Sequence, residues 1–191
     1  MKVRFSIAAI LAMFMLVPAA PARADVVLTP YVGSLFGGDL SGSKTAFGGS
    51  AAFMGGGIFG VEFGFNYSPE FVSASVANEE IAQMSLMGNL IVGIPIGSSD
   101  QPGHVRPYIT GGAGLFRITS NESQFFDQVT SNDFAVNFGG GIMAFFNEHV
   151  GLRGDLRYFR TLTDDNPGGG LDFDLGDLNF WKWDVGAAFK F

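Results

Sequence analysis

Large apolar side chains alternate with small or polar ones along this sequence, and this two-residue period restricts the fold more than any other feature. From Phe59 to Tyr67 every odd position is aromatic or aliphatic, whereas the even positions are Gly60, Glu62, Gly64 and Asn66. Successive side chains of a β-strand point to opposite faces, so this segment has one bulky apolar face and one small polar face. The same pattern recurs at 150–158 and at 181–191. No segment after residue 24 shows sustained helical periodicity, and we therefore expect a chain made of strands.

The alternation predicts eight strands, most of them long enough to cross the hydrocarbon of a bilayer at a tilt. The predicted connections alternate between long and short, which is the pattern of outer-membrane barrels with short turns on the periplasmic side. The connection at 95–103 fits the short class least well. Pro30 and Pro107 count against two of the strands, because each removes a ladder donor. The predicted strands are 26–36, 46–54, 58–68, 80–94, 104–118, 134–146, 149–160 and 178–191.

The strand faces opposite the large apolar ones point to a barrel rather than to an ordinary sheet with one face in water. These faces are dense in glycine, which makes up 28 of the 191 residues, and they carry isolated charges. Such faces suit the cramped interior of a narrow barrel. Hydrocarbon offers backbone groups no hydrogen-bond partner, so spanning strands must close on themselves. The predicted fold class is all-β: a closed eight-stranded antiparallel up-and-down transmembrane β-barrel. A soluble lipocalin-like barrel is the alternative.

The N-terminus has the three parts of a cleavable secretory signal peptide. Lys2 and Arg4 form a positive start, residues 5–17 are almost entirely apolar, and Ala22-Arg23-Ala24 supplies a small-residue cleavage site. The apolar run is shorter than the ~20 residues of a spanning helix. We therefore predict a signal peptide at 1–24 and one outer-membrane β-barrel domain at 25–191. Cysteine is absent, which excludes a lipid-modified cysteine, disulfides and thiol chemistry.

Ionisable residues occupy the small-residue faces and are therefore predicted to point into the barrel. Uncompensated charge in a narrow interior is costly, so we expect these side chains to pair as a salt-bridge network that fills the lumen. Eight strands leave an interior just wide enough for side chains, which favours a structural plug over a gated ion path or an open pore. The predicted network consists of Glu62, Arg106, Arg153, Asp155, Arg157, Lys182, Asp184 and Lys190.

Aromatic residues on the bulky faces fall near one rim of the predicted barrel. In membrane barrels such residues form girdles that flank the apolar band at the two interfaces. Aromatic side chains also fill soluble cores, but the phase of these residues places them on the outside. The predicted aromatic girdle consists of Phe65, Tyr67, Tyr158, Trp181 and Trp183.

The C-terminal strand carries the strongest resemblance to a known family. Its last residues resemble the recognition signal of the outer-membrane barrel assembly machinery: a polar residue, a glycine two positions later, and two aromatic residues ending on a terminal phenylalanine. The matching positions are Asp184, Gly186, Phe189 and Phe191. The whole chain after residue 24 resembles the small eight-stranded OmpA/OmpX-like barrels of the outer membrane protein beta-barrel domain group. Phrases such as Arg106-Pro107-Tyr108 and Gly154-Asp155-Leu156-Arg157-Tyr158 also resemble members of that group.

No arrangement in the sequence predicts a catalytic residue, a cofactor or a metal site with defined ligands. The run Gly55-Gly56-Gly57-Ile58-Phe59-Gly60 matches a dinucleotide motif by letter, but a strand rather than a helix follows it, so a tight hairpin is expected. His104 and His149 fall at the short-turn ends of strands, where we expect solvated side chains. Loop 161–177 is dense in aspartate, and a Ca²⁺ site that bridges it to lipopolysaccharide is an alternative to a flexible solvated loop.

The resemblance implies a fold and a compartment but not one activity, because the group includes adhesins, envelope-integrity factors and members with no assigned role. We predict a non-catalytic integral protein of the outer membrane of a Gram-negative bacterium, with both termini in the periplasm. Its expected partners are outer-membrane lipid, lipopolysaccharide and, during biogenesis, the barrel assembly machinery. The net charge of −7 argues against nucleic acid. The alternatives are a surface adhesin or receptor that binds through its long loops, with Phe125-Phe126 as an anchor, and a lipid A-modifying enzyme.

Overall fold

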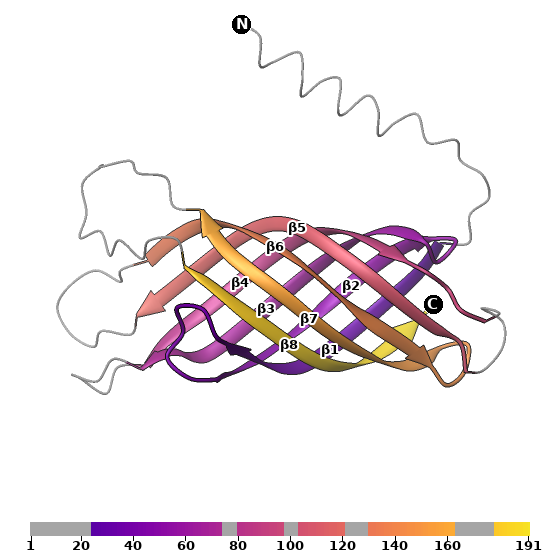
Figure 1. Cartoon of the computed structure of the whole chain (residues 1–191), viewed down its shortest axis with the longest axis horizontal. Coiled ribbons are helices and arrows are strands. Elements are labelled where there is room, and N and C mark those ends of the chain that lie inside the picture. Colours follow the sequence, from indigo (N-terminus) through magenta and orange to yellow (C-terminus); the bar gives the residue numbers. More distant parts are fainter. Residues whose placement is uncertain (1–23, 74–79, 98–102, 121–129, 163–177) are drawn as a thin grey trace, which may run out of the picture.

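A computed structural model describes residues 24–73, 80–97, 103–120, 130–162 and 178–191. In these residues the chain forms eight antiparallel strands that close into a barrel in chain order, β8 returning to β1 (Figure 1). This architecture confirms the predicted fold class. The strands are β1 Ala24–Phe36, β2 Lys44–Gly55, β3 Phe59–Ser73, β4 Glu80–Gly93, β5 Val105–Ser120, β6 Thr130–Phe145, β7 Val150–Leu162 and β8 Asn179–Lys190.

The predicted signal peptide at 1–24 lies almost entirely outside the described residues. Within them, no helix is both long enough and apolar enough to span a membrane.

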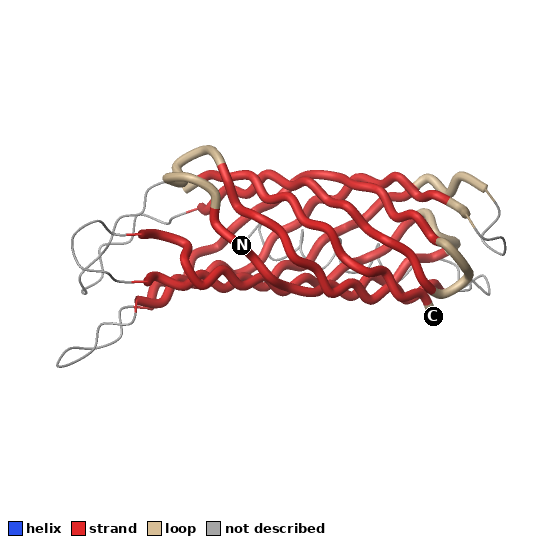
Figure 2. Tube along the Cα trace, turned by 90° about the horizontal axis from the view of Figure 1, so that it is seen from below, coloured by secondary structure: helices blue, strands red, loops and turns tan. Residues whose placement is uncertain are grey.

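The register of the ladders fixes the tilt of the strands. Val26 pairs with Phe53 on β2, and following the partners from strand to strand around the barrel leads through Trp181 back to Phe36 on β1. One circuit therefore advances ten residues along β1, from Val26 to Phe36. For eight strands, this stagger corresponds to a tilt of about 40° from the barrel axis. The inclined strands are visible in Figure 2.

The two ends of the barrel differ in their connections. At one end, which we call the turn end, β2, β4 and β6 pass to the next strands through 56–58, 94–104 and 146–149. At the other, the loop end, the connections are 37–43, 74–79, 121–129 and 163–178. The start of β1 and the last residue of the sequence meet at the turn end, where the Val26 amide donates to the Phe191 carbonyl at 3.2 Å and the Phe191 amide donates to the Val26 carbonyl at 2.9 Å.

The glycine run after β2 forms the tight hairpin that the sequence predicts. Gly56 and Gly57 adopt φ angles of 59° and 70°, which residues with a side chain rarely adopt, and the Ile58 amide donates to the Gly55 carbonyl at 3.2 Å. The connection after β4, which fitted the short class least well, is not a simple turn. The chain still pairs beyond the end of β4, where Ile96 and Val105 form an isolated bridge.

Both prolines that counted against their strands lie inside strands. Pro30 sits in β1, where the pairing between β1 and β8 skips Thr29 and Pro30. The missing N–H of proline explains why this ladder is interrupted. Pro107 pairs with Ile142 of β6. A third proline has a larger effect: the register between β3 and β4 shifts between Ser68 and Val72, around Pro69. β3 continues past this bulge to Ser73, five residues beyond its predicted end.

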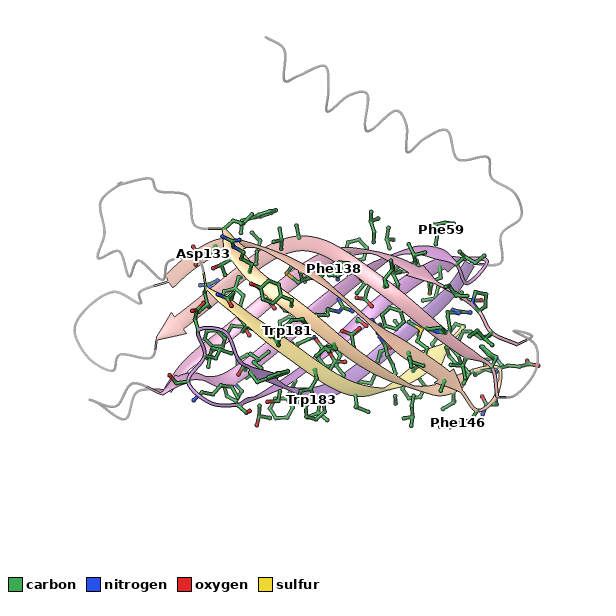
Figure 3. The ribbon with its side chains drawn as sticks, in the orientation of Figure 1. Phe59, Asp133, Phe138, Phe146, Trp181 and Trp183 are labelled. Carbon is green, nitrogen blue, oxygen red and sulfur yellow. The ribbon has the colours of Figure 1, made fainter. Side chains whose placement is uncertain are left out.

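The outer face of the barrel is apolar over most of its length. Phe63, Leu156 and Val185, whose phase predicted an outward direction, are 58%, 45% and 47% exposed rather than buried together. Figure 3 shows Phe138, Trp181 and Trp183 on the outside of the wall. In water a surface of this size would be unfavourable, whereas in hydrocarbon it is the favoured one.

The inner face was expected to be small and polar throughout, and this expectation is wrong at both ends. Near the loop end, the rings of Phe71, Phe116, Phe159 and Phe180 pack inside the barrel. Near the turn end, a second apolar cluster contains Met54, Ile91, Met143 and Phe145, among others. The lumen therefore has three layers, with the polar residues in the middle.

Candidate functional site

The middle of the lumen contains the densest group of charged side chains in the described part of the chain. They come from three strands: Glu62 from β3, the alternate residues Arg153, Asp155 and Arg157 from β7, and Lys182 and Asp184 from β8. The two-residue period of a strand directs all of them inward, and each is buried.

Glu62 joins the two arginines of β7. Its carboxylate lies 2.5 Å from Nη1 of Arg153 and 2.7 Å from Nη2 of Arg157, and Asn89 of β4 donates to it at 3.3 Å. The side chain of Glu62 is completely buried. A buried carboxylate is tolerated only when its charge is compensated; here Arg157 and Asn89 donate to one oxygen of Glu62, and Arg153 forms an ion pair with the other.

Asp155 contacts the same two arginines. Nε of Arg157 donates to its carboxylate at 2.6 Å, Nη2 of Arg153 lies 3.2 Å away, and the Tyr108 hydroxyl also donates to it. Tyr108 in turn accepts from Nε of Arg153 at 2.7 Å, and the Arg153 guanidinium lies 4.8 Å from the centre of the Tyr108 ring. These contacts fix the orientation of the Arg153 guanidinium group.

Lys182 and Asp184 extend the group onto β8. Nζ of Lys182 lies 2.9 Å from the Asp184 carboxylate and donates to the Tyr31 hydroxyl at 3.1 Å. Lys182 pairs in register with Arg157, and Asp184 with Asp155. Like charges directly opposite each other on neighbouring strands repel, so each needs an opposite charge nearby. Each has one two residues away on its own strand: Arg157 contacts Asp155 at 2.6 Å, and Lys182 contacts Asp184 at 2.9 Å.

The central group is electrically balanced. Three carboxylates face three cations, and every one of the six has an opposite partner within 3.2 Å. We call these six residues the lumen network: Glu62, Arg153, Asp155, Arg157, Lys182 and Asp184. A cavity of about 20 Å³ beside it, lined in part by Ser50, Asn66 and Ser85, has room for about one water molecule. The polar layer is therefore filled by side chains.

Two residues predicted for this network lie elsewhere. Arg106 is fully buried near the turn end and pairs with Asp25 of β1 at 2.8 Å, an acid that the sequence analysis did not include. Lys190 lies over the Phe145 ring, 5.5 Å from its centre, and Arg106 approaches the same ring at 5.7 Å. The alternation predicted that both side chains point inward, but they belong to the layer between the network and the turn end.

The expectation for one histidine is also wrong. His104 is buried and stacks on Phe145, with ring centres 4.6 Å apart, rather than being solvated. His149 is exposed, as expected.

The loop end of the lumen is closed by aromatic rings. Phe180 lies at the centre, with ring centres 5.8 Å from Phe71, 5.9 Å from Phe116 and 5.2 Å from Phe159. Leu40, in the connection after β1, packs against this cluster. The connection is held to β8 because Asp39 accepts from the backbone and side-chain amides of Asn179 at 2.8 and 2.6 Å. Phe159 and Phe180 have the same phase as Arg157 and Lys182, and this signal could have predicted their inward direction.

The predicted girdle residues lie on the outer face. Phe65, Tyr67, Trp181 and Trp183 are exposed, and the rings of Tyr158 and Trp181 are 5.3 Å apart. The residues of the predicted assembly signal divide between the two faces of β8. Phe189 and Phe191 face outward, whereas Asp184 belongs to the lumen network. Gly186 faces inward, where a Cβ atom would lie 2.4 Å from the Pro30 carbonyl oxygen.

The chemistry that this site supports is electrostatic and structural. No group of three or more His, Cys, Asp or Glu side chains that could hold a metal ion occurs in the described ranges. The acidic part of loop 161–177 and the Phe125-Phe126 pair lie outside those ranges, so the Ca²⁺ hypothesis and the proposed anchor stay predictions.

An apolar exterior around a closed sheet, with a charged and filled interior, defines the class of membrane-spanning β-barrels. Residues 9–191 match the family model described as outer membrane protein beta-barrel domain, and the chain belongs to this family. The family places the protein in the bacterial outer membrane. A comparison with curated protein sequences found no match.

Solved structures with the same fold come from several bacteria. The N-terminal β-barrel domain of OprF from Pseudomonas aeruginosa is 16% identical, with a TM-score of 0.56 over 89% of this chain and 99% of that one. Neisserial surface protein A is 14% identical, with a TM-score of 0.60 over 87% and 95%. Ail of Yersinia pestis, the attachment invasion locus protein, was solved with the heparin analogue sucrose octasulfate. It is 16% identical, with a TM-score of 0.55 over 88% and 99%. At these identities the likeness concerns the fold alone.

Proposed function

We propose that this protein is a non-catalytic structural barrel of the outer membrane that supports the envelope and presents its loops at the cell surface, without acting as an open pore. The turn end and both termini face the periplasm, and the loop end faces outward. This orientation follows the rule that short turns of outer-membrane barrels are periplasmic and long loops extracellular.

The observation that carries this proposal is the filled, charge-neutral lumen. A channel needs a continuous water-filled path, and porins obtain it from 16 or more strands. In this barrel the Phe180 cluster, the lumen network and the Met143 cluster occupy successive layers of the interior. The same layers argue against catalysis, because the buried charges are engaged with one another and leave a cavity of only about 20 Å³.

Four measurements test the proposal. A folded outer-membrane barrel should migrate faster on a detergent gel before heating than after it, and should fractionate with the outer membrane rather than with the fluid released by osmotic shock. Purified protein in planar bilayers should then give no steady conductance. Release by osmotic shock would favour the lipocalin-like alternative, and a stable open conductance would contradict the plug. A change in the lipid A profile on deleting the gene would contradict the absence of catalysis.

The proposed partners follow from the end of β8 and from the apolar outer face of the barrel. Phe189 and Phe191 are exposed at the turn end, where the barrel assembly machinery would read them during biogenesis. Outer-membrane lipid and lipopolysaccharide would cover the apolar outer face. The conservative variant Phe191→Leu should slow assembly in cells more than it changes the stability of the purified barrel.

A second candidate function is a surface adhesin. It is supported by the likeness in fold to Ail, whose name describes attachment and invasion. Deletion of residues 121–129 between β5 and β6 separates the two candidates. An adhesin would lose binding to its surface partner, whereas a structural barrel would keep envelope integrity and show no binding to lose.

A further inference from the structure

The outward face of the strands is almost free of charge. Among the outward-facing strand positions whose side chains the structure describes, only Arg117 on β5 and Arg160 on β7 carry one, and both side chains are exposed. Both lie close to the loop end. Outward positions close to the turn end are apolar, for example Phe59, Leu152 and Phe189. The outward cations are therefore confined to one rim of the barrel.

The register places these two arginines at nearly the same height. Arg160 pairs with Val136 on β6, which pairs with Ala113 on β5, four residues before Arg117. One circuit of eight strands advances ten residues along β1. Each step to the paired residue on the next strand therefore lies about 1.25 residues closer to the loop end. The two steps from Ala113 to Arg160 therefore place Arg160 about 2.5 residues closer to the loop end than Ala113, whereas Arg117 is four residues closer. The remaining difference of about 1.5 residues corresponds to about 4 Å along the axis of strands tilted by about 40°.

The same reasoning places the arginines just beyond the aromatic girdle. Tyr158 precedes Arg160 by two residues on the same face, which is about 5 Å along the barrel axis. Tyr67 pairs with Met84 on β4, and Met84 pairs with Arg117 on β5. Two steps from strand to strand place Arg117 about 2.5 residues, or about 6 Å, closer to the loop end than Tyr67. Aromatic belts lie at the level where hydrocarbon meets headgroups. Cations about 5 Å farther out lie at the level of lipid phosphates.

From this placement we infer that Arg117 and Arg160 form a phosphate-binding collar, which engages the phosphate groups of lipopolysaccharide in the outer leaflet. The inference rests on the orientation given under the proposed function, since the loop end must lie in the leaflet that contains lipopolysaccharide. The collar would set the depth of the barrel in the membrane.

The chemistry of the two groups suits this role. A guanidinium offers five N–H donors in a planar fork that matches phosphate oxygens, so binding a phosphate is compatible with other contacts of the same side chain. Phosphate monoesters such as those of lipid A carry a charge of about −1.5 to −2 and three acceptor oxygens. The phosphodiester of a phospholipid has a single charge. Lipid A should therefore bind the collar more tightly than phosphatidylglycerol.

The test measures lipid binding to the full chain refolded in zwitterionic micelles, by native mass spectrometry. The probes are bisphosphorylated lipid A, the same lipid A with its phosphates removed, and phosphatidylglycerol. The variants are R117Q, R160Q and the double variant, each checked for folding by its heat-modifiable mobility. K44Q is the matched control, because Lys44 lies at the same end in the inward phase of β2.

We expect bisphosphorylated lipid A to bind the unaltered protein at least tenfold more tightly than either other lipid. Each arginine substitution should weaken binding about fivefold, and the double variant about 25-fold, since one cation near an anionic surface contributes about that factor. K44Q should stay within about twofold of the unaltered protein.

Equal binding of the phosphorylated and dephosphorylated lipids by the unaltered protein would overturn the inference without recourse to any variant. Equal affinity for phosphatidylglycerol would overturn the assignment to lipopolysaccharide, and an equal loss in K44Q would reduce the effect to net charge. If the barrel folds and fractionates with the outer membrane but shows no preference for phosphate, the collar fails while the proposed function stands.

Discussion

Replacing Glu62 with glutamine would remove the charge that joins Arg153 and Arg157 while keeping the side-chain volume nearly constant. The lumen network would then contain three cations and two carboxylates. Breaking a buried ion pair by removing one partner costs about 3–5 kcal/mol, because the other charge stays buried without compensation. Asp155 still contacts both arginines, which prevents a larger loss. We predict that Glu62→Gln lowers the free energy of unfolding by about 4 kcal/mol.

Urea unfolding in lipid vesicles, followed by tryptophan fluorescence, measures this change. With a denaturant slope of about 2 kcal/mol per molar, the midpoint should fall by about 2 M. The double variant Glu62→Gln with Arg157→Gln restores equal numbers of opposite charges, so it should recover more than half of the loss. Glu148→Gln, an exposed acid in the 146–149 turn, is the matched control and should change stability by less than about 0.5 kcal/mol.

Two results would refute the reasoning about Glu62. A loss below about 1 kcal/mol in the single variant would show that the buried charges do not depend on one another. Strictly additive losses in the double variant would show the same, because coupled groups in one network deviate from additivity.

Three further predictions concern the two ends of the lumen and the wall, all measured by the same unfolding experiment. Phe180→Ala should cost about 3–5 kcal/mol, because it leaves a cavity among three other rings; a cost near zero would mean that the cluster is not packed. Asp25→Asn should cost about 1.5–3 kcal/mol, since it removes the charged acceptor of the buried Arg106, and an unchanged midpoint would contradict the pairing. Gly141→Ala should impair refolding, because its Cβ would lie 2.1 Å from the Gly154 carbonyl oxygen, whereas Gly64→Ala, with open space around it, should be tolerated. Equal effects of these two glycine substitutions would be inconsistent with the wall geometry.

The sequence predicted whether a side chain points into or out of the barrel better than it predicted the position of that side chain along the barrel axis. A two-residue period needs no knowledge of neighbouring strands, so it identified Glu62, Arg157 and Asp184 as inward residues. Whether two inward residues meet depends on the stagger of the whole barrel, which no local pattern contains. Arg106 was therefore grouped with the central charges, although its partner is Asp25 at the start of β1.

Local irregularities account for another part of what the sequence did not reveal. Phe71 is at an odd position of β3, as are Phe63 and Phe65, and simple alternation would direct it outward. Around Pro69, β3 has two more residues than β4 between the pairs Ser68–Gln83 and Val72–Ile81, which interrupts the alternation, and Phe71 becomes part of the inner aromatic cluster. Extra residues on one strand form a bulge that changes the direction of nearby side chains.

The central claim is that the outer face of this barrel is solvated by lipid, and depth-dependent quenching of its two tryptophans tests it most directly. Single-tryptophan variants, Trp183→Phe and Trp181→Phe, are refolded into vesicles whose lipids carry bromine at different positions along the acyl chain. Trp181 and Trp183 are two residues apart on the outward face of β8, so Trp183 should be quenched from about 5 Å deeper in the bilayer. Efficient quenching of both by brominated chains, with this offset, is the predicted result. Quenching by soluble iodide with none from the brominated lipids would contradict the account.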